Sequence, residues 1–310
     1  MKMRFLGVTA SLALIMGTPA IAQTATPAPA PAAPATTPVA TVDADPALWV
    51  VKDDDTTIYL FGTVHVLKPG LSWFDEGVKE AFDASQEVVL EIPLPSDADA
   101  QKILLPLVVD PDGPTLTNKL HPEKRAVFVS ALAKVGLPPA ALDQLYPWFA
   151  AVTISQIQLQ KGGYDPASGA ERTIDAAAKA AGKPVTGLET LQQQLGYFAT
   201  LPEADQIEFL EMGVDDFDEG LTTIGEMVSN WAKGDPEALA TVMNRDIGKL
   251  PKLYDVLLKQ RNIRWADWID ERMKKPGTVF MAVGAGHLAG KDSVQVQLGT
   301  HKLTATRVKY

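Results

Sequence analysis

Two histidines of this chain close the same short motif, Gly-x-x-His, near opposite ends of the sequence. Residues 62–65 read Gly-Thr-Val-His and residues 284–287 read Gly-Ala-Gly-His. The chain has only four histidines, so half of its imidazole groups stand in one repeated pattern. Histidine is the commonest metal ligand and a general acid or base near neutral pH. The repetition predicts that His65 and His287 share one site, although either alone could simply cap a strand.

Each motif follows an apolar run that is typical of a buried strand. Residues 57–61 read Thr-Ile-Tyr-Leu-Phe and residues 278–283 read Thr-Val-Phe-Met-Ala-Val, both rich in β-branched or aromatic side chains. Glycine then lets the backbone turn or approach another segment closely. We therefore expect each histidine just past the end of a strand.

Two glutamates have the same placement. Glu91 lies at the end of the strand-like run 87–92, which stops at Pro93, and Glu189 ends the short run 184–189. Either glutamate alone could be an ordinary N-cap or a surface residue. If the four strands are parallel neighbours, however, all four side chains gather at one edge of the sheet, where open α/β sheets bind ligands.

Two imidazoles and one or two carboxylates form a plausible divalent-metal site with an open position for water. Such an ion would lower the pKa of the bound water, and a spare carboxylate such as Glu91 or Glu189 could act as general base. The residues therefore predict a site made of His65, His287, Glu91 and Glu189.

Arg261 is a further candidate, because it lies on the apolar stripe of a helix predicted over residues 254–273, between Leu258 and Trp265. A guanidinium on a core face needs a buried carboxylate, backbone oxygens or a substrate anion, or its side chain must reach water. The sequence leaves these alternatives open.

The remaining pattern predicts an α/β fold with a helical middle region. The runs 48–51 and 57–61 read as a hairpin, and a helix after residue 72 leads to the strand at 87–92 as a parallel crossover. Further helices are expected in four segments: 97–160, 166–181, where Glu171 falls on the buried face, 203–250, and weakly 292–298. A final strand is expected over 303–308.

The N-terminal residues predict export. Residues 1–22 have the basic start, apolar stretch and small-x-small cleavage site of a signal peptide, so we expect a periplasmic or secreted protein cleaved after Ala22. Residues 23–46 are nearly all Ala, Pro and Thr and predict a linker. One domain over residues 47–310 follows, without cysteine and without a predicted membrane span.

Composition and motifs exclude several functions. The formal net charge of −10 argues against nucleic acid as a partner. A His-Glu-x-x-His helix, a Gly-x-x-x-x-Gly-Lys loop and a Gly-x-Ser-x-Gly elbow are all missing from the sequence, and a cysteine nucleophile is impossible.

Seven short segments occur in an order that resembles the TraB/GumN family, which is related to the Tiki proteases. They are 61–65, the strand ending in Glu91, Pro147-Trp148, 163–165 followed by Glu171, 187–190, Arg261-Asn262 with Trp265, and 283–288. The resemblance covers about residues 45–310. It implies a mixed α/β fold of the erythromycin-esterase/ChaN-like type, in which the N- and C-terminal Gly-x-x-His strands flank the helical middle region.

The resemblance also implies divalent-metal-dependent proteolysis, as in the Tiki members. His65 and His287 match the metal ligands, Glu91 matches the strand-end acid, and Glu189 and Arg261 match recurrent positions. One departure is that residues 293–298 alternate as a strand would, where the family continues into an apolar helix.

Two functional hypotheses follow. The first is an exported hydrolase, most plausibly a peptidase, in which His65 and His287 bind Mn, Co or Zn, Glu91 or Glu189 activates water, and the substrate is a peptide or another small extracytoplasmic molecule. The second is a noncatalytic module that binds a peptide or glycan in the same cleft.

Overall fold

The computed structural model describes residues 41–248 and 250–310. The predicted signal peptide and residues 23–40 of the predicted linker lie outside these residues. The last linker positions are part of the fold, because strand β1 (Val42–Asp43) pairs with β4 (Leu71–Ser72) and Ala44 is buried. Within the described residues, no helix combines the length and apolar character needed to cross a membrane.

The centre of the molecule is a six-stranded mixed sheet in the order β6-β5-β7-β3-β2-β8. β3 (Thr56–Thr63), β7 (Gly277–Gly284), β5 (Glu87–Leu90) and β6 (Val185–Gly187) run parallel to one another. β2 (Leu48–Lys52) is antiparallel to β3, which confirms the predicted hairpin, and β8 (Thr306–Arg307) is antiparallel to β2. The first crossover is parallel as predicted, but β7 lies between β3 and β5.

Helices cover both faces of the sheet, because the central strands carry apolar side chains on both sides. On one face, Trp265 and Ile269 of α12 (Gln260–Met273) pack against Ile58 and Met281. On the other, α1 (Glu76–Ala84), α6 (Ala170–Ala180) and α9 (Gly220–Ala232) pack against the side of the sheet that carries Phe61 and Phe280.

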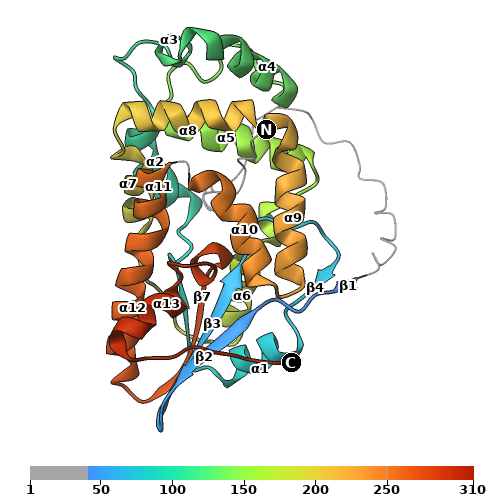
Figure 1. The fold of residues 1–310 in the computed structure, drawn as a ribbon, viewed down its shortest axis with the longest axis vertical. Helices are drawn as coiled ribbons and strands as arrows, with labels where there is room; N and C mark the ends of the chain where they lie inside the picture. The colour runs from blue at the N-terminus through green and yellow to red at the C-terminus, as the bar shows by residue number, and fades with distance from the viewer. Residues whose placement is uncertain (1–40, 249) are drawn as a thin grey trace, which may run out of the picture.

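A helical region extends the molecule beyond the carboxyl ends of the parallel strands, with α3 (Leu116–Lys119) and α4 (Arg125–Val135) farthest from the β2–β3 hairpin (Figure 1). It has its own apolar core, which includes Trp148 and Phe209. The remaining α-helices are α2 (Asp97–Val108), α3 (Leu116–Lys119), α4 (Arg125–Val135), α5 (Pro147–Lys161), α7 (Leu191–Ala199), α8 (Glu203–Asp215), α10 (Pro236–Ile247), α11 (Pro251–Tyr254) and α13 (Val294–Leu298). Short turns of helix are η2 (Pro122–Lys124), η3 (Pro166–Ser168), η4 (Phe217–Glu219), the π-helical η5 (Asp255–Lys259), η6 (Ala285–Leu288) and η7 (Gly299–His301).

Three predicted elements differ in detail. The helix expected over 254–273 is interrupted by the π-helical turn η5, so that only α12 is regular. The helix expected from 166 begins at Ala170, because η3 comes first. Residues 294–298 form helix α13, as the weak helical pattern predicted, and not the strand that their alternating polarity indicated. The last strand, β8, has only two residues.

Candidate active site

Four parallel strands deliver the predicted side chains to one edge of the sheet. Along that edge the order is Glu189 after β6, Glu91 after β5, His287 after β7 and His65 after β3. Backbone pairing continues past the strands, since Glu189 N donates to Glu91 O at 2.8 Å. All four side chains are buried, with 4 to 7% of each residue exposed. Buried polar groups of this kind require partners. Arg261 contacts Glu189, Glu91 and His287, and Glu171 contacts His65.

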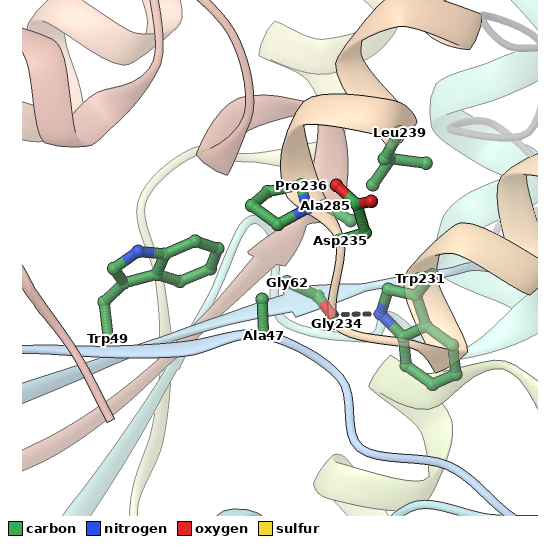
Figure 2. Close-up of a pocket in the computed structure, with 9 residues that line it drawn as sticks. All are labelled: Ala47, Trp49, Gly62, Trp231, Gly234, Asp235, Pro236, Leu239 and Ala285. Atoms are coloured by element: carbon green, nitrogen blue, oxygen red, sulfur yellow. Dashed lines mark hydrogen bonds between the residues drawn. The ribbon is translucent and has the colours of Figure 1, made fainter. Parts of the chain in front are cut away.

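The two Gly-x-x-His motifs pack directly on each other. A Cβ added to Gly62 would lie 3.0 Å from Ala285 Cα, so the first motif reaches the second only because its first residue is glycine. Trp231 Nε1 donates a 2.7 Å hydrogen bond to Gly62 O from the other side, and Figure 2 shows this pair beside Ala285. The backbone at Gly62 is thus held by contacts with both Ala285 and Trp231.

We expect Gly62→Ala to lower the free energy of unfolding by about 1–3 kcal/mol, because the new methyl group must push the two motifs apart. Denaturant titration measures this. Gly196→Ala is the matched control: nothing lies within 4 Å of its new Cβ, and alanine should stabilise the interior of α7. An equal effect of the two substitutions would contradict the packing argument.

Arg261 is the centre of the charged cluster. Its Nη2 lies 2.5 Å from Glu91 Oε2, and its Nε donates to both oxygens of Glu189 at 3.0 and 3.1 Å. The residue is 3% exposed, so its side chain does not reach water. Of the alternatives that the sequence left open, two are correct: buried carboxylates, and a backbone oxygen, Leu257 O, at 3.2 Å from Nη1. Burial lowers the pKa of Arg261, but the two carboxylates together raise it.

Glu91 is held as a carboxylate. Burial alone would raise its pKa, but the Arg261 guanidinium, the two histidines and the backbone N–H of Gly284 at 2.7 Å together lower the pKa well below its usual range. Gln194 donates a further hydrogen bond to Oε2 at 2.7 Å. A carboxylate held in this way stays charged and fixed in direction.

His287 is a neutral imidazole with a defined tautomer. Arg261 Nη1 lies 3.0 Å from His287 Nε2, and because a guanidinium only donates, Nε2 must accept. The proton is then on Nδ1, 2.6 Å from Asn262 Oδ1, and Asn262 in turn donates to Asp292 O. Burial, followed by Arg261, lowers the pKa of His287 to about 3.

His65 has a different partner, Glu171, from the start of α6. Its Nδ1 lies 2.6 Å from Glu171 Oε1 as an ion pair rather than an aligned hydrogen bond, and Thr63 Oγ1 donates to the same oxygen. Burial lowers the pKa of His65, but the Glu171 carboxylate outweighs burial and raises it above 6.5. His65 Nε2 is buried and has no hydrogen-bond partner among the described residues.

Glu171 and Asn262 therefore join the site. Glu171 had two signals in the sequence: it is a carboxylate on the buried face of a helix, and it belongs to one of the segments that resemble the family. Asn262 had only its place beside Arg261 in another of these segments. Glu189 contacts Arg261 and accepts from Tyr197 at 3.1 Å, but within the described residues its side chain forms no hydrogen bond or ion pair with either histidine.

The imidazole nitrogens and carboxylate oxygens of the site are atoms of the types that bind divalent ions. Each imidazole has Nδ1 beside an oxygen of a neighbouring residue, as metal-binding histidines usually do. One point, where a Cβ would stand on Gly284, lies 3.0 Å from Glu91 Oε1, 3.6 Å from His287 Cδ2 and 3.8 Å from His65 Nε2. The guanidinium of Arg261 nevertheless contacts both Glu91 and His287. Over residues 41–248 and 250–310, no three His, Asp or Glu side chains are arranged to hold a metal. An ion held there requires Arg261 to withdraw.

Fold and site together define an α/β protein with a buried glutamate–arginine–histidine cluster at the carboxyl edge of its parallel strands. A family model for the TraB/PrgY/gumN family matches residues 47–307, and the chain belongs to that family.

Two relatives illustrate the similarity. The uncharacterized protein YbaP of Escherichia coli (strain K12) is 24% identical over 258 residues, covering 82% of this chain and 92% of YbaP. An uncharacterized protein of Treponema pallidum (strain Nichols) is 22% identical over 269 residues, covering 79% and 78% of the two chains. No solved structure matches the chain.

Proposed function

We propose that this chain is an exported hydrolase that acts on peptides, that its active site is the cluster around His65 and His287, and that its fold is of the erythromycin-esterase/ChaN-like type. The observation that carries this proposal is the unpartnered Nε2 of buried His65, which lies within 3.8 Å of the point where Glu91 Oε1 and His287 also converge. A buried polar atom without a partner is costly, so its retention favours a bound group.

His65, His287 and Glu91 would hold a divalent ion, which we propose to be Mn, Co or Zn. When bound, such an ion supplies a Lewis acid that polarises a carbonyl and acidifies water. The protein's own residues do the rest: Glu171 orients His65, Asn262 selects the tautomer of His287, and the burial of the cluster restricts access of water.

We assign different roles to the two strand-end glutamates. Glu91 faces both histidines and is the ligand or base, whereas Glu189 shares Arg261 and gives the guanidinium a second carboxylate onto which it can withdraw. Arg261 thereby positions both carboxylates.

Replacing both histidines tests the proposal. His65→Ala with His287→Ala should abolish binding of Mn²⁺, Co²⁺ or Zn²⁺ in calorimetry and hydrolysis of a mixed peptide library in mass spectrometry. His121→Ala with His301→Ala removes the other two histidines of the chain and should change neither. Unchanged metal binding and hydrolysis in the first variant would show the proposal to be wrong.

A second candidate is a noncatalytic module that binds a peptide or glycan. The favouring observation is that Arg261 already compensates Glu91 and Glu189, so the cluster is stable without an ion. This function predicts saturable binding without turnover, unaffected by chelators.

A further inference from the structure

A small cavity of about 40 Å³ lies directly in front of the two histidines. We call the part of the wall made by Thr63, His65 and His287 the histidine end; the other side chains of the wall are apolar. Two methionines belong to it, Met227 from α9 and Met243 from α10. The volume holds roughly three water molecules or one small aliphatic group.

The residues that line the cavity determine which chemical groups of a ligand can bind in it. Ile224, Leu239 and Leu258 complete the apolar side and offer no hydrogen bond to a polar or charged group. Placing a lysine or aspartate side chain there would leave its charge without a partner. At the histidine end, by contrast, the unpartnered Nε2 of His65 requires a polar group. A ligand that satisfies both ends has an aliphatic side chain next to an amide.

Met243 stands at the entrance of the cavity. Met243 and Gly286 are half-buried, whereas the other lining residues are buried. A Cβ on Gly286 would lie 2.2 Å from Met243 Cε, so the thioether lies against the second Gly-x-x-His motif. Because methionine is unbranched and has three rotatable bonds, it can move aside for a ligand.

We propose that this cavity is the subsite for a small aliphatic side chain, such as that of alanine or valine, next to the bond at the histidines, and that Met243 sets the size limit. The proposal rests on the function proposed above, and it adds the substrate class and a specificity-determining residue.

Methyl NMR of the protein with ¹³C-labelled methionines tests the subsite without requiring turnover. N-acetyl-valinamide should shift the signals of Met243 and Met227, and N-acetyl-lysinamide at the same concentration should not. Met212, in the separate helical core, is the internal reference. No shift up to the solubility limit of the valine amide, or equal shifts with the lysine amide, would overturn the proposal.

Substitutions test the size limit. Met243→Ala should improve binding of N-acetyl-phenylalaninamide, and relative cleavage of library peptides with large apolar residues, by about tenfold or more. Met243→Trp should abolish the shift of the Met227 signal caused by the valine amide, and Met243→Leu should retain it. Met212→Ala should leave the relative cleavage of library peptides unchanged.

The two proposals fail separately. Binding of valine amide without cleavage of any peptide would contradict the hydrolase and leave the subsite standing. Cleavage without preference for a small aliphatic residue, unchanged in Met243→Ala, would overturn the subsite and leave the hydrolase standing.

Discussion

Replacing Arg261 by methionine should lower the free energy of unfolding by about 3–5 kcal/mol, because it leaves two buried carboxylates without their counter-charge. Glu91 and Glu189 are each less than 10% exposed, and Arg261 contacts both within 3.1 Å. Arg261→Lys should recover only part of the loss, since an ammonium cannot reproduce the planar fork that meets Glu91, Glu189 and His287 together. Denaturant titration at neutral pH measures both variants.

Arg264 is the matched control for this prediction. It lies on the same helix and approaches Glu189 to 3.8 Å, but its side chain is 48% exposed. Arg264→Met should therefore cost no more than about 1 kcal/mol. Adding Glu91→Gln and Glu189→Gln to Arg261→Met should return part of the stability, because the unpaired charges are then gone. A loss below about 1 kcal/mol for Arg261→Met would mean that the cluster does not stabilise the fold as its geometry indicates.

Acid should destabilise the protein already between pH 6.5 and about 4.5, above the range in which carboxylates titrate. Burial and Arg261 lower the pKa of His287 from 6.5 to about 3, so in this window the unfolded chain binds a proton that the native protein refuses. Stability therefore falls as the pH falls, by about 1.4 kcal/mol per pH unit from this one residue. Urea titrations at several pH values measure the slope.

The titration of His65 does not cancel this fall in stability with falling pH. Its pKa is raised by Glu171, so its stabilising contribution is fully present below pH 6.5 and is lost only as the pH rises through its native pKa. Below about pH 4.5 the slope should steepen, because Glu91, whose native pKa is lowered, stays charged in the folded protein while the unfolded chain is protonated.

His287→Gln should remove the slope between pH 6.5 and 4.5, and His301→Gln, at the surface beside Asp267, should preserve it. The same slope in His287→Gln and in the unsubstituted protein would show that another group takes up the proton.

The strand-end residues could be predicted because they depend on local pattern. Apolar runs of strand length ending in a histidine or glutamate, separated by helical segments, favour parallel strands whose ends share one edge. Glu91 and His287 follow this logic, and Arg261 Nη2 and Nη1 contact both of them. Strand order could not be predicted from the apolar runs: β7, the last long strand in the sequence, lies between β3 and β5.

The partner of each buried charge could not be predicted. From its place on an apolar stripe, Arg261 could have contacted a carboxylate, backbone oxygens, a substrate anion or water. Only the approach of β5 and β6 brings two carboxylates to it. Glu171 was visible as a buried acid, but its contact with His65 depends on how α6 docks beside β3, more than a hundred residues earlier in the chain.

Local sequence pattern was enough to predict the candidate site residues and the strand that each one follows, because hydrophobic periodicity and glycine placement act over a few residues. The sharing of the buried charges depends on tertiary packing: Arg261 lies between Glu91 and Glu189, Glu171 pairs with His65, and Asn262 pairs with His287. A buried charge is stabilised by whichever opposite charge or dipole lies within a few ångströms, and such distances between remote segments exist only once the helices pack on the sheet.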